Sequence, residues 1–173
     1  MAALFGPRAD FLAGRPDPLA LLSLGLFLVL ALASAMAVVD MARPFVGSRR
    51  DGWVWNALMA GMLPLSALLL IVANLMRGAA SGVHFDGTNC MQYGLLWGGL
   101  TAAALTLWLR RGAPAEPNRA GFLTGVAAGS AGIFAVSLYC PHNEVIHIGL
   151  WHGTTVVIAG VIGRLVVPRL VRW

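Results

Sequence analysis

Five long apolar stretches, separated by short polar connections, dominate the pattern of this chain. They cover residues 19–39, 54–76, 91–109, 120–138 and 146–167. About 20 apolar residues span the hydrocarbon core of a bilayer as an α-helix, so each stretch is predicted to be a transmembrane helix. Apolar residues run on continuously instead of alternating with polar ones, which argues against a transmembrane β-barrel.

The connections are too short to hold a soluble domain. They carry the Pro, Gly, Asn, Asp and Arg residues that end helices. The first apolar stretch is too long for the core of a cleaved signal peptide, so we expect it to be retained. The pattern therefore predicts one all-α, polytopic membrane domain over residues 1–173.

Composition supports a lipid environment. Hydrophobic residues make up 58% of the chain and charged residues 11%, whereas soluble domains carry roughly 25% charged residues. A soluble chain this apolar could not cover its surface with polar groups, so the lipid bilayer is the first predicted partner.

The distribution of arginine predicts how the helices cross the membrane. All 12 basic residues are arginines, and the following nine fall on one side of a five-helix chain: Arg43, Arg49, Arg50, Arg110, Arg111, Arg119, Arg164, Arg169 and Arg172. Basic residues favour the cytoplasmic side, which places the N-terminus outside and the C-terminus in the cytoplasm. Because the arginines lie between apolar runs, topology explains them better than direct binding to nucleic acid.

Glycines recur at helical spacing in the last two stretches. Gly121, Gly125 and Gly129 follow one another at intervals of four, and Gly149 and Gly153 do so in the last stretch. Small residues at this spacing allow the backbones of two membrane helices to approach closely. We therefore expect the last two helices to pack tightly.

Every cysteine and histidine falls on the outward side of the predicted topology. The six residues are Cys90, Cys140, His84, His142, His147 and His152. An oxidising compartment allows disulfides, and thiolate and imidazole ligands select Zn, Cu and similar thiophilic ions. The sequence thus suggests either a thiol switch between Cys90 and Cys140 or a metal site that draws on all six residues.

The spacing of two histidines weakens the metal interpretation. His147 and His152 are five residues apart, which separates them by about 140° around a regular α-helix. They could share one ion only if the helix began irregularly.

The cysteines and His152 could instead have purely structural roles. Cys90 and Cys140 could form a structural disulfide, and His152 could be an interior residue hydrogen-bonded to a neighbouring helix. No catalytic triad, carboxylate pair or nucleotide-binding loop is visible in the sequence, so we do not expect an enzyme.

One part of the chain resembles a known family. The residues 137–141 (Ser-Leu-Tyr-Cys-Pro), His147, the pair Trp151 and His152, and Gly160 and Gly163 resemble the C-terminal half of NrsF-type membrane anti-sigma factors. Cys90, residues 110–114 and residues 169–173 are similar to further parts of that family, and the resemblance covers about residues 27–173.

The resemblance implies a stress sensor of the bacterial inner membrane. Such proteins hold an extracytoplasmic-function sigma factor and release it under heavy-metal or oxidative stress. Carried over, Cys90 and Cys140 would be the sensing pair, with His147 and His152 as neighbours. Family members have six helices and a cytoplasmic N-terminal tail, so this chain looks as if the tail and the first helix were missing.

The partner would meet the cytoplasmic arginines. We expect Arg49, Arg50, Arg110 and Arg111 to contact the sigma factor. Rival interpretations are a membrane redox, haem-binding or metal-binding protein and a subunit of a larger membrane complex. A single cysteine pair and polar groups near the helix ends speak against electron relay and transport.

Overall fold

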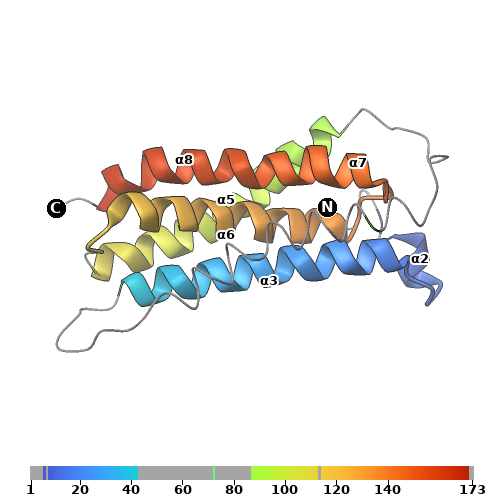
Figure 1. Cartoon of the computed structure of the whole chain (residues 1–173), viewed down its shortest axis with the longest axis horizontal. Coiled ribbons are helices and arrows are strands. Elements are labelled where there is room, and N and C mark those ends of the chain that lie inside the picture. The colour runs from blue at the N-terminus through green and yellow to red at the C-terminus, as the bar shows by residue number, and fades with distance from the viewer. Residues whose placement is uncertain (1–5, 7, 43–71, 73–86, 113, 172–173) are drawn as a thin grey trace.

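The computed structural model describes residues 6, 8–42, 72, 87–112 and 114–171, and every regular element in them is helical. Four long helices form a bundle (Figure 1): α3 (Pro18–Met41), α5 (Thr88–Gly112), α6 (Pro117–Ser137) and α8 (Gly153–Val171). Three short segments lie at one end of it, namely α2 (Ala9–Leu12), α7 (Val145–His147) and the π-helical turn η1 (Ile148–His152). The predicted all-α class is confirmed.

Local sequence sets where the helices begin. The carboxylate of Asp17 caps α3 by accepting a hydrogen bond of 2.8 Å from the backbone N–H of Leu19. Pro18 and Pro117 open α3 and α6, where a missing N–H costs nothing. These two helices and α5 match the predicted stretches 19–39, 120–138 and 91–109 within three residues at each end.

Helix α6 is the centre of the bundle. It packs against α8, α5 and α3, and 78% of its most apolar stretch is buried, against 33% in α3. Glycines make this possible, because a side chain on Gly125 would overlap the backbone of α8 at Ala159. The tight contact between α6 and α8 is therefore confirmed.

The second predicted glycine pair does not take part in that contact. Gly149 and Gly153 both face open space. Gly163, ten residues beyond Gly153 in α8, instead meets the backbone of α6 at Gly121 and Gly125. The expectation for Gly149 and Gly153 was wrong because the spacing alone does not say which face of the helix meets its neighbour.

Three helical segments in the described part of the chain are long and apolar enough to cross a membrane: Pro18–Met41, Pro117–Ser137 and Ile148–Val171. Helix α5 would reach about 37 Å at 1.5 Å per residue but is less apolar and is not among them. Predicted stretch 54–76 lies, apart from Val72, outside the described residues. A membrane protein is supported, while the number of five spans and their direction stay predictions.

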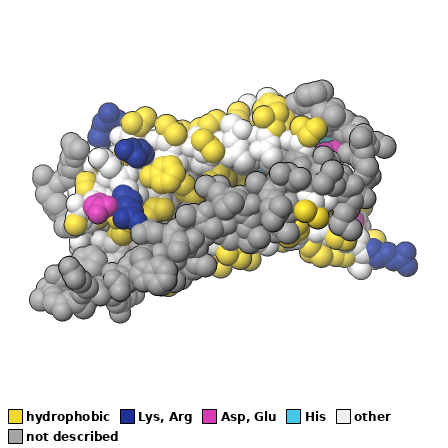
Figure 2. Space-filling view, in the orientation of Figure 1, with side chains coloured by type: hydrophobic (Ala, Val, Ile, Leu, Met, Phe, Trp, Pro, Cys, Tyr) yellow, Lys and Arg dark blue, Asp and Glu magenta, His cyan; other side chains and the backbone are white. Residues whose placement is uncertain are grey.

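The surface of the bundle suits lipid contact. Most of the exposed large hydrophobic side chains lie on α3, α5 and α8, for example Leu32, Leu100 and Leu165. In Figure 2, hydrophobic side chains lie along the length of the bundle and basic side chains stand toward its ends. Such a distribution is typical of a bundle whose sides face acyl chains.

Candidate metal and thiol site

The two cysteines come from helices α5 and α6, although 50 residues separate them. Cys90 lies in the first turn of α5, and Cys140 follows the C-terminal end of α6, where its backbone N–H donates to the carbonyl of Val136. Because α5 and α6 run antiparallel in Figure 1, the start of one meets the end of the other. Their sulfur atoms are 3.6 Å apart, and no disulfide joins them in this structure.

A π-helical turn brings the two histidines to the same place. His147 ends α7 and His152 ends η1. A π-helix closes hydrogen bonds between residues five apart, so it stacks residues that a regular α-helix would set about 140° apart. The two imidazole rings meet at 5.3 Å between centroids and an interplanar angle of 78°. The irregular helix start that the metal interpretation requires is thus present.

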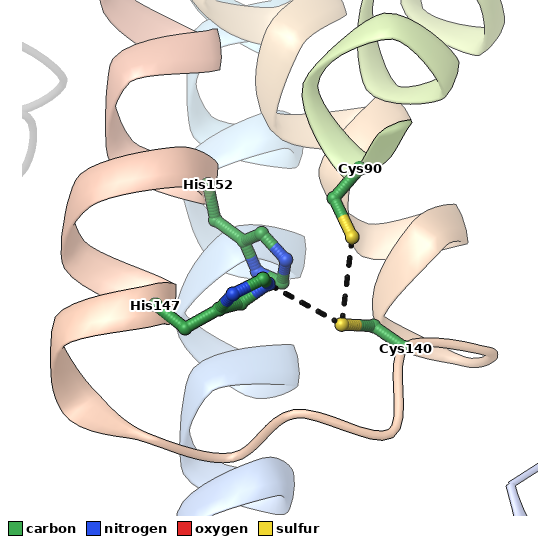
Figure 3. A group of neighbouring side chains, drawn as sticks. All are labelled: Cys90, Cys140, His147 and His152. Carbon is green, nitrogen blue, oxygen red and sulfur yellow. Dashed lines mark hydrogen bonds between the residues drawn. The ribbon is translucent and has the colours of Figure 1, made fainter. Parts of the chain in front are cut away.

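These four side chains converge on one point between the helices (Figure 3). One ligand atom from each of Cys90, Cys140, His147 and His152 lies within 4.8 Å of the other three. Tetrahedral Zn²⁺, with bonds of about 2.3 Å to sulfur and about 2.0–2.1 Å to nitrogen, holds neighbouring ligand atoms about 3.3–3.8 Å apart. The distances from Cys140 Sγ to Cys90 Sγ (3.6 Å) and to His147 Nε2 (3.5 Å) already fall in that range.

Burial leaves the histidines short of hydrogen-bond partners. His147 and His152 are 1% and 2% exposed. Within the described part of the chain, neither nitrogen of His152 has a hydrogen-bond partner, and Nδ1 of His147 also lacks one. Buried polar atoms are nearly always paired, so the unpaired ring of His152, which belongs to the four-ligand group, fits a metal ion that would take one of its nitrogens.

The protonation states of Cys140 and His147 favour the binding of a metal ion. The hydrogen bond from the Cys90 thiol lowers the pKa of Cys140 far below its ordinary value, although burial acts in the opposite direction. Burial lowers the pKa of His147. Thiolate and neutral imidazole are the forms that bind metals. The folded chain therefore presents both groups in the state that a thiophilic cation needs.

The other predicted ligands do not join this group. The side chain of His142 is 32% exposed, and its Nδ1 lies 3.8 Å from a carboxylate oxygen of Glu144. Its ring is 5.0 Å from that of His147, but His142 is not among the four converging ligands. The structure therefore does not bring His142 into the four-ligand group, and His84 lies outside the described residues.

Two of the four predicted partner-binding arginines lie far from the cluster. Arg110 and Arg111 are exposed in the last turn of α5, whereas Cys90 is in the first turn of the same helix. Arg49 and Arg50 lie outside the described residues. Any effect of the cluster on these arginines has to pass along the bundle.

Sequence reasoning missed a buried arginine beside Cys140. Nothing in the sequence pattern singles out Arg8, yet it is 7% exposed and donates to the backbone carbonyl of Cys140 at 3.0 Å. Its guanidinium also pairs with Asp10 at 2.7 Å, which lowers the pKa of that carboxyl. An arginine two residues from an aspartate was the available signal, but nothing in the pattern linked it to a residue 132 positions away.

Comparison with known protein families shows to which family the chain belongs. The family described as negative regulator of sigma F, NrsF, matches residues 1–173. The chain belongs to the NrsF family. The resemblance seen in the cysteine and histidine pattern is therefore confirmed.

Two relatives of this family show how far the similarity extends. "Anti-sigma-F factor NrsF" of Caulobacter vibrioides is 31% identical over 147 residues, which cover 84% of this chain and 68% of that protein. "Probable anti-sigma-F factor NrsF" of Azospira oryzae is 29% identical over 178 residues, covering 100% of this chain and 81% of that protein. Both names describe regulators. No solved structure matches the chain.

Proposed function

We propose that this chain is a membrane-embedded anti-sigma factor whose hold on its sigma factor responds to thiophilic metal ions or to oxidation. The names of its NrsF relatives support the regulatory role. The observation that carries the sensing role is the convergence of two sulfurs and two imidazoles within 4.8 Å. Such a set is costly to bury without a function.

The donor set favours soft or borderline divalent ions. Two thiolates and two neutral imidazoles form the common tetrahedral set for Zn²⁺, and thiolates also favour Cu(I) and related ions. Cys90, Cys140, His147 and His152 would be the ligands. Binding would displace the thiol protons that remain and would take one nitrogen from each imidazole ring.

Oxidation would act on the same two sulfurs. A two-electron oxidant takes two electrons from Cys90 and Cys140, their remaining protons leave to solvent, and one S–S bond forms. A disulfide needs a sulfur–sulfur distance of about 2.05 Å, against 3.6 Å here. Where the start of α5 and the loop after α6 approach each other to close this gap, the oxidation state would be linked to the position of the helices.

The proposed setting is the inner membrane of a bacterium, with five spans and the cluster facing outward. The excess of arginine on the predicted cytoplasmic side supports this direction. Arg110 and Arg111 from the third connection, with Arg49 and Arg50 from the first, would then be available to a cytoplasmic partner. An extracytoplasmic-function sigma factor is the partner that we propose for them.

The decisive experiment measures partner affinity in three states of the site. Full-length protein in lipid nanodiscs would be prepared reduced, Cd²⁺-loaded and oxidised, and titrated with the sigma factor of the same bacterium that corresponds to sigma F. Allosteric coupling commonly changes affinity by roughly 5–150-fold, and we expect a weakening in that range for the loaded or the oxidised protein. Cys90→Ser with Cys140→Ser should abolish the response, and equal affinity in all three states would refute the proposal.

A further inference from the structure

A group of polar residues outside the ligand cluster holds the loop that carries Cys140. We call it the polar latch, and it consists of Arg8, Asp10, Asp17 and Asn143. Arg8 and Asp10 flank the start of α2, Asp17 caps α3, and Asn143 lies in the irregular segment 140–144. The latch therefore joins segments more than 120 residues apart.

Arg8 is the centre of the polar latch. Its Nη1 donates to the carbonyl of Cys140 at 3.0 Å and to Oδ1 of Asn143 at 2.7 Å. Its Nε and Nη2 donate to the two carboxylate oxygens of Asp10 at 2.9 and 2.7 Å. Paired forks of this kind fix direction as well as distance, and the Arg8 side chain is only 5% exposed.

The second half of the latch connects the same loop to α3. Nδ2 of Asn143 donates to Oδ2 of Asp17 at 3.2 Å, while the other oxygen of Asp17 caps the helix. Asn143 thus accepts from one latch residue and donates to another. The loop cannot move without disturbing either the guanidinium or the helix cap.

We propose that Arg8 is a positioning residue of the metal and thiol site, and that the polar latch fixes Cys140 relative to the other three ligands. This inference rests on the proposed function for its metal readout. Cys140 lies beyond the end of α6, where no helix holds its carbonyl, and Arg8 supplies that partner. Groups that orient metal ligands from outside typically change metal affinity by roughly 10–100-fold when removed.

The test compares Arg8→Gln with Arg15→Gln in the full-length protein. Arg15 is exposed in the same N-terminal segment, so its replacement removes the same charge from the same region. Cd²⁺ affinity, followed by the sulfur-to-metal charge-transfer band, should fall by roughly 10–100-fold for Arg8→Gln and by less than about twofold for Arg15→Gln. An equal loss in both variants, or none in Arg8→Gln, would overturn the inference.

A second readout does not depend on metal. The latch also sets the approach of Cys140 to Cys90, so the rate of disulfide formation with diamide, a two-electron oxidant, should change severalfold in Arg8→Gln and stay constant in Arg15→Gln. If the wild-type protein binds no Cd²⁺, the metal branch of the proposed function fails while this rate still tests the latch. An unchanged diamide rate in Arg8→Gln would then refute the inference.

Asn143→Ala is a milder variant that tests the polar latch even if Arg8→Gln does not fold. It removes one acceptor and leaves Arg8 paired with Asp10. We expect a smaller loss of Cd²⁺ affinity and a smaller change in the diamide rate than in Arg8→Gln, with circular dichroism unchanged. Arg8→Lys should lie between wild type and Arg8→Gln, because lysine keeps the charge but not the planar fork. Wild-type values in Asn143→Ala for both readouts would count against the latch.

Discussion

At the scale of single residues, His152 makes the case for a ligand most directly. It is 2% exposed, and its two nitrogens have no hydrogen-bond partner within the described part of the chain. Leaving a polar group unpaired in this way costs about 1–3 kcal/mol. Phe27 of α3 adds only an edge contact with its ring, at 6.0 Å between centroids. A bound cation would pair one of these two nitrogens and so lower this cost.

Replacing His152 should therefore separate stability from metal binding. In His152→Leu, we expect Cd²⁺ affinity to drop by more than roughly tenfold, because one of four ligands is lost. Thermal stability without metal should not fall, because leucine has a similar size and no unpaired nitrogen. Equilibrium dialysis and thermal unfolding measure the two effects. His142→Leu is the matched control and should keep wild-type affinity, since His142 stands outside the converging group.

A second prediction at this scale concerns acid. The pKa of Cys140 is lowered mainly by the hydrogen bond from Cys90, so its thiolate should persist on the acid side of the ordinary thiol value, which is about 8.5. The midpoint of its alkylation rate against pH should lie well below that of the unfolded chain. Cys90→Ala removes the donor and should move the midpoint upward. Identical midpoints in wild type and Cys90→Ala would show that this hydrogen bond does not control the thiol.

At the scale of elements, the π-helical turn allows two histidines five residues apart to share one site. A π-helical turn amounts to one extra residue in an α-helix. It occupies Ile148–His152, between the two histidine ligands. Downstream, α8 continues as a regular helix and keeps its contact with α6. The extra residue therefore rotates His147 toward the sulfurs without disturbing the packing of the bundle.

Shortening and lengthening this turn by one residue are expected to affect metal binding differently. Deleting Gly149, which faces open space, leaves the histidines four apart, and residues four apart share a face of an α-helix. We expect the deletion to keep Cd²⁺ affinity within about tenfold. Inserting one alanine after Gly149 separates the histidines by six and should weaken binding by more than roughly tenfold. Equal affinities in the two variants would contradict the role given to the turn.

The turn also marks where prediction from sequence reached its limit. The apolar runs predicted α3, α5 and α6 closely, because burial and lipid contact are encoded in local composition. The gathering of cysteine and histidine at one end followed from topology. The shared site of His147 and His152 could not be predicted, since regular helical geometry places them apart. Arg8 was missed because its contacts with Cys140 and Asn143 join distant segments.

At the scale of the whole molecule, the metal and thiol ligands and the exposed arginines lie at opposite ends of α5. The sulfur and imidazole ligands lie where α5 begins and α6 ends, while Arg110 and Arg111 lie where α5 ends. Trp151, in the π-helical turn, packs over Gly87 just before α5, so α5 touches the site at its first residues. Helix α5 is therefore the most direct physical connection between the ligands and the exposed arginines.

Membrane direction is the prediction that belongs to this scale. A membrane-impermeant maleimide applied to intact cells should label Cys90 or Cys140 after reduction, and Cd²⁺ added first should prevent the labelling. A cysteine placed at Arg111 in a Cys90→Ser, Cys140→Ser background should react only after the cells are opened. The reverse pattern would invert the topology and place the site on the cytosolic side.

The short distance between the two sulfurs has one more consequence. A tetrahedral ion would hold them about 3.8 Å apart, close to the 3.6 Å observed, whereas a disulfide would draw them to about 2.05 Å. One pair of sulfur atoms cannot satisfy both geometries at once. Metal that arrives first should shield the thiols from oxidants, and prior oxidation should leave the ion without its sulfur ligands. When both stresses occur together, the order of their arrival would decide which one the protein records.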